Sequence, residues 1–192
     1  MWALQFEVDR DFDFRGLAGQ TLSIKKHTSD GSAFRLGLSV GLEVGESENS
    51  QGGDRDFNSR LLEISMQRVF YPDITADANL FYGIGIFGSF SHNKNEYQPS
   101  RPISGYSEFR KSLFDTWSGG VSGILGGEYF IAKSFSLLGE FRTDISFRCQ
   151  KRDDDYQSFY NGVLQSSYHV EEKTNSIRIS ADNIKFGLSF YF

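Results

Sequence analysis

Hydrophobic and polar residues alternate along much of this chain with a period of two, and helical periodicity is weak throughout. Residues 33–44 are the clearest case, because aliphatic and aromatic side chains alternate there with polar residues and glycine. Residues 80–90, 117–131 and 135–149 repeat the pattern. Successive side chains of a β-strand point to opposite faces, so each segment predicts a strand with one apolar face and one polar face.

Shorter alternating segments predict further strands at residues 2–8, 22–25, 62–67 and 185–192. About eight strands result, each near the roughly 9–11 residues that a tilted strand needs to cross a bilayer. Ile177 and Ile179 fall on the opposite parity from Phe186. We therefore expect a β-bulge or a break in the strand near residues 181–183.

The connections between these strands alternate in length. We expect short connections at residues 27–32, 71–78 and 132–134, and long polar loops at 9–20, 45–58, 91–112 and 150–175. Short turns at one end and long loops at the other are typical of bacterial outer-membrane barrels. The sequence therefore predicts an all-β fold, a closed antiparallel up-and-down transmembrane β-barrel of eight strands, in a single domain that covers residues 1–192.

The orientation of the two faces separates a soluble barrel, which is apolar inside, from a membrane barrel, which is apolar outside. The polar face mixes glycine and serine with charges of both signs, which suits a crowded lumen where buried charges are paired. Aromatic residues gather near both ends of the strands, as they do at lipid–water interfaces. We expect an inward polar network that consists of Lys25, Arg35, Glu43, Glu63, Glu128, Glu140, Arg142, Asp144, Arg148 and Lys185.

Composition excludes several classes of protein. Of the 192 residues, 39% are hydrophobic and 16% aromatic, and this aromatic content argues against a disordered chain. No stretch approaches the roughly 18 apolar residues of a membrane-spanning helix. The net charge of −5 argues against a nucleic-acid partner, which would require clustered basic residues. Cys149 is the single cysteine, so an intrachain disulfide is excluded.

The C-terminal segment 185–192 resembles the assembly signal of Gram-negative outer-membrane proteins. That signal has a polar residue, a glycine two positions later and alternating hydrophobic residues that end in an aromatic one; the matching positions are Lys185, Gly187, Phe190 and Phe192. By pattern and loop layout, the whole chain resembles the small eight-stranded barrels of the OmpA transmembrane-domain and OmpX class. The resemblance implies an integral outer-membrane location and handling by the barrel assembly machinery.

Both termini of a barrel with an even number of strands lie on one side of the membrane, and the resemblance implies that this side is the periplasm. An outer-membrane protein must be exported. Yet Met1 leads directly into the first alternating segment, without a basic stretch, an apolar stretch or a cleavage site. We interpret the sequence as the mature form with an added initiating methionine.

Few residues suggest catalysis. Lipid A-modifying enzymes share this architecture, and they need a serine nucleophile beside a histidine base. The candidate pairs are His92 with Ser89 or Ser91, His169 with Ser166 or Ser167, and His27 with Ser29. None forms a convincing triad, and the histidines and Cys149 lack metal-ligand spacing. We expect no catalytic residue, no metal and no cofactor, and we interpret the aspartates at 153–155 as a solvated charge run.

The interior of an eight-stranded barrel is just wide enough for side chains, so we expect no diffusion pore. We expect a structural or surface-interaction protein that acts through its extracellular loops. Its expected partners are outer-membrane lipid, lipopolysaccharide, whose phosphates suit basic loop residues such as Lys94 and Arg110, and an extracellular protein. Two alternatives stay open, a lipid A-modifying enzyme and a transporter of small hydrophobic ligands through a lateral opening.

Overall fold

The computed structural model describes residues 1–9, 19–29, 31–49, 53–72, 77–99 and 105–192. Eight antiparallel strands follow one another in chain order, and the pairing of the first with the last closes a barrel. The strands are β1 (Trp2–Asp9), β2 (Gln20–Ser29), β3 (Ser32–Asn49), β4 (Gly53–Phe70), β5 (Ala78–Pro99), β6 (Tyr106–Ala132), β7 (Phe135–Tyr160) and β8 (Val163–Tyr191). The predicted fold class is confirmed. Among the described residues, no helix has the length and apolar character needed to cross a membrane.

The barrel wall is apolar outside and charged inside. Leu36 and Ile84 are 57% and 63% exposed on the outer surface, whereas Lys25 and Glu128 are each 2% exposed in the lumen. Exposed aliphatic side chains on every strand are favourable only if the surrounding solvent is itself apolar. The alternation therefore has the orientation of a membrane barrel, as the sequence predicted.

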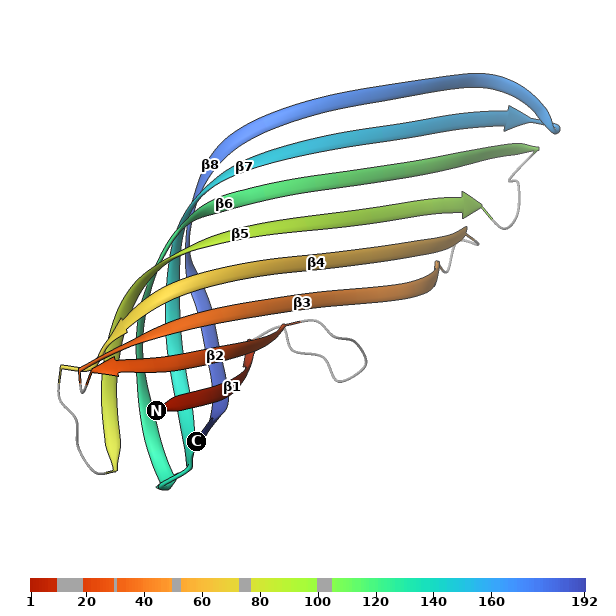
Figure 1. Cartoon of the computed structure of the whole chain (residues 1–192). Coiled ribbons are helices and arrows are strands. Elements are labelled where there is room, and N and C mark those ends of the chain that lie inside the picture. The colour runs from red at the N-terminus through yellow and green to blue at the C-terminus, as the bar shows by residue number, and fades with distance from the viewer. Residues whose placement is uncertain (10–18, 30, 50–52, 73–76, 100–104) are drawn as a thin grey trace.

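Most of the polar segments that we expected to be long loops are strands instead. β1 and β2 have 8 and 10 residues, whereas β6, β7 and β8 have 27, 26 and 29. Figure 1 shows β3 to β8 continuing beyond β1 and β2 as one curved sheet. We call this continuation the distal sheet; it comprises residues 41–49, 53–61, 91–99, 106–116, 150–160 and 163–174. Of the loop expected at 9–20, residues 10–18 lie outside the described residues.

A two-residue turn explains why the expected loop at 150–175 is a hairpin. Tyr160 pairs with Val163, and the residues between them have positive φ angles, 49° at Asn161 and 77° at Gly162. Two left-handed residues match the twist of a β-hairpin, and asparagine followed by glycine adopts this conformation at low cost. Beyond the membrane, the polar residues of β7 and β8 thus satisfy their backbone groups by pairing with each other.

The short connections and the bulge are confirmed. β2 and β3, β4 and β5, and β6 and β7 are joined near the end of the barrel that holds both termini, here called the terminal end. Arg142 pairs with Asn183 but Asp144 pairs with Ser180, so one β7 residue faces two residues of β8. This bulge allows the apolar side chains on either side of it to face outward together.

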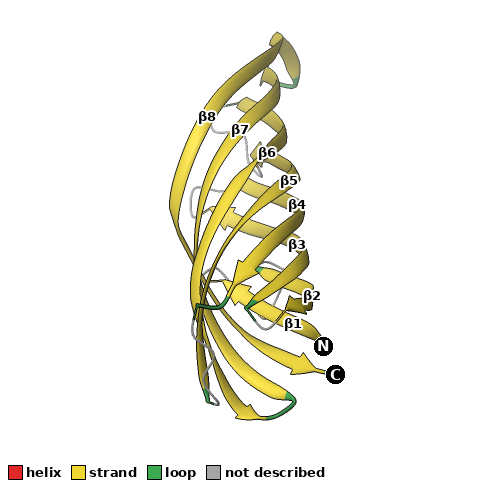
Figure 2. Cartoon of the chain, turned by 60° about the vertical axis from the view of Figure 1, so that its left-hand side comes forward, coloured by secondary structure: helices red, strands yellow, loops and turns green. Residues whose placement is uncertain are grey.

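The distal sheet has two edges that no described strand pairs with. The β1–β8 ladder ends where Asp9 meets Lys185, and the β2–β3 ladder ends where Gln20 meets Val40. Beyond these pairs, residues 41–49 of β3 and 163–174 of β8 form the borders of the distal sheet, which is open and curved (Figure 2), and the unpaired edge of β8 continues below it to residue 184. The molecule therefore has a closed barrel below and an open sheet above, with the inward barrel face continuing into the concave face of the sheet.

Candidate functional site

The lumen at the terminal end is filled by a cluster around Lys25 of β2. Its ammonium group lies 2.9 Å from the Glu128 carboxylate of β6 and donates hydrogen bonds to the hydroxyls of Tyr71 and Tyr191, at 3.0 and 2.7 Å. Glu128 also accepts hydrogen bonds from Tyr191, at 2.6 Å, and from Ser136, at 2.5 Å. All three ammonium protons therefore have acceptors, which offsets part of the cost of burying the charge.

A second cluster is centred on Arg35 of β3, which uses each of its three nitrogens. Nε donates to Gln67 at 2.6 Å, one terminal nitrogen to Glu7 at 3.2 Å and the other to Glu140 at 2.6 Å. Arg35 is only 5% exposed. The guanidinium thus joins β1, β3, β4 and β7 across the lumen, with one cation between two carboxylates.

A third cluster lies nearer the distal sheet. Arg142 of β7 donates to Asp144 at 2.7 Å and to Glu63 at 2.6 Å, and its guanidinium stacks over the Phe87 ring at 4.7 Å. Lys185 of β8 donates to the Thr21 hydroxyl at 2.9 Å. These contacts occupy the route from the distal sheet into the barrel.

The structure places most of the residues expected in the inward network inside the lumen. Glu43 is a correction: it has the inward parity, but it lies in the distal sheet beyond the closed ring and is exposed. Arg148 is half-buried and contacts only the Thr116 hydroxyl, at 3.4 Å, among the described residues. Sequence reasoning missed several network members, although all have the inward parity of their strands: Glu7, Gln67, Tyr71 and Tyr191.

The network crosses the lumen and joins opposite sides of the barrel. Its charges balance, with cations at Lys25, Arg35, Arg142, Arg148 and Lys185 and anions at Glu7, Glu63, Glu128, Glu140 and Asp144. Each cluster connects strands that are far apart in the sequence. Such contacts favour a single barrel geometry, because a change of register would leave buried charges without partners.

The two distal histidines pair with aspartates, not with serines. His92 Nδ1 lies 2.6 Å from Asp115 on the outer face of the sheet. Ser89 has the inward parity, and its hydroxyl instead contacts that of Ser118 at 2.8 Å. Ser166 likewise contacts Ser158, at 2.7 Å. These contacts give neither His92 nor His169 the serine partner that an acyl-transfer mechanism requires.

His169 lies between two carboxylates on the convex face of the β7–β8 hairpin. Its Nδ1 is 2.8 Å from Asp155 and 3.3 Å from Asp153. The ligand atoms of these three residues lie within 4.8 Å of one another, a spacing that would suit a metal ion. The hydrogen bond to Asp155 and the charge of Asp153 raise the pKa of His169, so a metal ion would have to displace a proton from this imidazole. We still predict that the chain holds no metal ion.

The raised pKa of His169 predicts a pH dependence within the β7–β8 hairpin. The contact with Asp155 is present when the imidazole is charged, so it persists below the ordinary histidine pKa and is lost as the pH rises through the raised value. An NMR titration should show the His169 midpoint falling in Asp155→Asn, whereas Asp115→Asn, next to His92, should leave it unchanged. An identical midpoint in Asp155→Asn would contradict this assignment.

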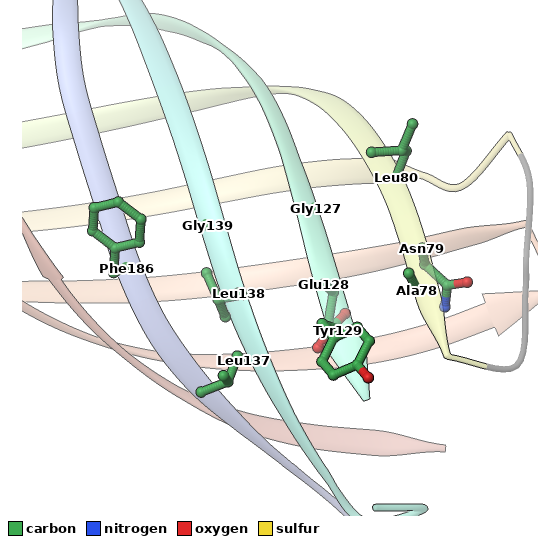
Figure 3. A pocket seen from close by; sticks show the side chains of 10 residues that line it. All are labelled: Ala78, Asn79, Leu80, Gly127, Glu128, Tyr129, Leu137, Leu138, Gly139 and Phe186. Carbon is green, nitrogen blue, oxygen red and sulfur yellow. The ribbon is translucent and has the colours of Figure 1, made fainter. Parts of the chain in front are cut away.

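A hollow of about 380 Å³ lies on the outer wall near the terminal end, across β5 to β8 (Figure 3). Gly127 and Gly139 are direct cross-strand partners, so no side chain fills the space between Tyr129 and Phe186. On its inner side, Glu128 is bound to Lys25. The hollow opens on the outer, lipid-facing wall, and it gives the transporter alternative no specific support.

The C-terminal residues of the assembly motif form the seam of the barrel. The backbones of Phe192 and Trp2 exchange two hydrogen bonds, each 3.0 Å long. Lys185 and Gly187 face the lumen, whereas Phe190 faces outward. A Cβ on Gly187 would collide with the Phe6 carbonyl oxygen and lie 2.9 Å from Glu7 Cγ, so only glycine fits this close approach.

Deletion of Phe192 is expected to reduce the amount of folded barrel in the outer membrane, because it removes the last backbone pair of the β1–β8 seam. Gel mobility of unheated membrane extracts separates folded from unfolded barrels and measures the effect. Phe192→Tyr, which keeps an aromatic ring and the backbone pair, should assemble normally. Unchanged folded protein after the deletion would show that the seam closes without this residue.

Comparisons with known proteins identify the fold but no relative by sequence. No family model matches the chain, and no curated protein matches it. Among solved structures, the chain is similar to CarO2 of Acinetobacter baumannii, with a TM-score of 0.53 and 11% identity, over 100% of this chain and 98% of the other. A major outer membrane protein of Thermus thermophilus has a TM-score of 0.48 and 10% identity, over 100% and 98%. The chain thus has the fold of the small outer-membrane β-barrels.

Proposed function

We propose that this small outer-membrane β-barrel is a non-enzymatic surface-interaction protein, with a closed lumen, periplasmic termini and a distal sheet that stands outside the cell. The observation that carries the proposal is the contrast between the two halves of the molecule. Ion pairs fill the lumen around Arg35 and Lys25, whereas β3 to β8 continue as a polar sheet that nothing described covers. A protein that needed only an anchor would not require strands of 26 to 29 residues.

Lipopolysaccharide is the partner that the outer face of the sheet supports. Beyond the apolar belt, Arg60, Lys94, Lys111 and Lys151 point outward on β4 to β7. Lys94 and Lys111 lie 2.9 and 3.8 Å from Glu96 and Lys151 lies 2.6 Å from Glu171, so a lipid phosphate would compete with these carboxylates. In the proposed orientation the four basic side chains lie at the level of the lipid phosphates, which bind such groups through charge-assisted hydrogen bonds. Folding would proceed through the barrel assembly machinery, and a protein partner would bind the sheet further from the membrane.

Surface labelling tests the orientation. In a Cys149→Ser background, Ser167→Cys in the distal sheet should react with a membrane-impermeant maleimide on intact cells. Lys133→Cys, in the β6–β7 turn at the terminal end, should react only after the outer membrane is permeabilised. The reverse pattern would overturn the proposed placement of the sheet outside the cell.

Conductance measurements test the closed lumen. The purified protein, inserted into a planar lipid bilayer, is expected to give no channel steps, because the clusters around Lys25, Arg35 and Arg142 occupy the lumen. Stable open channels in the wild-type protein would contradict the structural role proposed for this network.

A further inference from the structure

The concave face of the distal sheet contains a hollow of about 250 Å³ whose lining includes three arginines and one acidic residue, Glu96. The Glu96 carboxylate is paired with Lys94 at 2.9 Å and lies 3.8 Å from Lys111. The arginines are Arg55 of β4, Arg110 of β6 and Arg152 of β7. Each has the strand parity of residues buried in the lumen, as Arg152 has that of Arg142, so all three face inward, above the mouth of the barrel. We call this place the arginine hollow.

Two of these guanidinium groups form no direct ion pair. Neither Arg55 nor Arg110 makes a hydrogen bond or a salt bridge with any residue in the described part of the chain. Tyr97 of β5 lies between them, because it is the cross-strand partner of both. The charge of Arg110 acts on two nearby carboxylates, Glu108 and Asp154, but neither bonds to it: Glu108 accepts a hydrogen bond from Tyr106 and Asp154 pairs with Arg152, each at 2.6 Å.

Arg152 is held in place but keeps a donor free. One terminal nitrogen bonds to Asp154 at 2.6 Å, and the guanidinium lies over the Phe114 ring, 5.4 Å from its centre. Its Nε–H is buried without an acceptor among the described residues. A buried donor without a partner is unfavourable, so this N–H can take an incoming acceptor, although Oδ1 of Asp154 beside it is likewise buried without a donor among the described residues.

We propose that the arginine hollow binds a small organic anion whose carboxylate or phosphate group is held by Arg55, Arg110 and Arg152. Guanidinium groups bind both oxyanions through paired, charge-assisted hydrogen bonds. The rings of Tyr97 and Phe114 provide a surface for a flat or apolar body, and the volume limits the ligand to a small molecule. A lipid phosphate is disfavoured because the hollow faces the concave side. The inference rests on the proposed function, for which it supplies a ligand class.

Calorimetric titration of the full chain in detergent micelles tests the site, with phenyl phosphate, benzoate, inorganic phosphate and neutral benzyl alcohol as probes. Phenyl phosphate and benzoate should bind, more weakly as salt is added, and benzyl alcohol should not. Arg110→Gln and Arg55→Gln should each weaken binding about tenfold, the effect of losing a charge-assisted hydrogen bond. Arg68→Gln, also an exposed arginine on the outer face of β4 but stacked on the rings of Phe34 and Phe70, is the matched control and should bind as the wild type does.

Three results would overturn the inference. The first is no saturable binding of either aromatic anion at low salt. The second is equal weakening by Arg68→Gln and Arg55→Gln, which would indicate general charge attraction. The third is inorganic phosphate binding as tightly as phenyl phosphate, which would show that the rings of Tyr97 and Phe114 do not contribute to binding. Surface labelling is independent of all three, so failure here and failure of the proposed orientation are distinguishable.

Discussion

Replacement of Arg35 by methionine is expected to destabilise the barrel by about 3–5 kcal/mol, the usual cost of removing one partner from a buried ion pair. The substitution leaves Glu7 and Glu140 in the lumen without the cation that lies 3.2 and 2.6 Å from their carboxylates. It also removes the donor to Gln67. Urea unfolding in micelles measures the change, provided that folding is reversible under those conditions.

Two further variants separate loss of the ion pairs from loss of side-chain volume. Arg178→Met on β8 changes an exposed arginine with no ion pair among the described residues, and it should alter the unfolding free energy by no more than about 0.5 kcal/mol. Adding Glu7→Gln and Glu140→Gln to Arg35→Met should recover much of the loss, because no uncompensated charge then remains. If the triple variant were no more stable than Arg35→Met, the unpaired carboxylates would not be the cause.

The barrel itself could be predicted from the sequence, because the two faces of its wall meet different surroundings. Lipid outside and a charged lumen inside require alternation, and this alternation fixes which face each residue occupies. The bulge in β8 followed from the same rule, since Ile179 and Phe186 cannot both face lipid on a regular strand. Beyond the membrane both faces meet water and the rule no longer applies, so the polar strands of the distal sheet resembled loops.

Local signals in those segments do exist. The Asn161–Gly162 pair indicates a tight hairpin, and cross-strand charges support its strands, as when Lys151 and Glu171 meet at 2.6 Å. The polar run after Gln150 lacks hydrophobic alternation, which is why alternation alone predicts a loop there. Turn chemistry was the better guide there.

The sequence predicts that charged side chains of both signs meet in the lumen, but it does not predict which cation pairs with which anion. Lys25 and Glu128 come from β2 and β6, so their meeting depends on how far the strands are staggered around the barrel, which strand alternation does not reveal. Strand parity shows which face of the wall a residue occupies, but not at which level along the barrel axis it lies. For this reason Glu43 was placed in the network although it lies above the closed ring, and Glu7 was missed although it faces inward.

The second large effect concerns the outer face. Leu36→Arg or Ile84→Arg is expected to cost about 2–4 kcal/mol, the range for arginine at the bilayer midplane in such barrels. Both side chains point away from the lumen and are more than half exposed, at 57% and 63%. In a membrane this exposure is contact with acyl chains, so a guanidinium there must be dehydrated or must distort the bilayer.

The same substitution at Val163 is the matched control. Val163 is 62% exposed, much as Ile84 is, but it lies beside the turn at the far end of the distal sheet. Val163→Arg should therefore leave the free energy of unfolding in lipid vesicles nearly unchanged, because the new charge meets water. Equal costs at residues 84 and 163 would mean that exposure alone, rather than lipid, sets the penalty, and the boundary drawn here between barrel and distal sheet would be wrong. A large cost at residue 84 with none at residue 163 locates the membrane on the closed half of the molecule, where the ion-pair network fills the lumen.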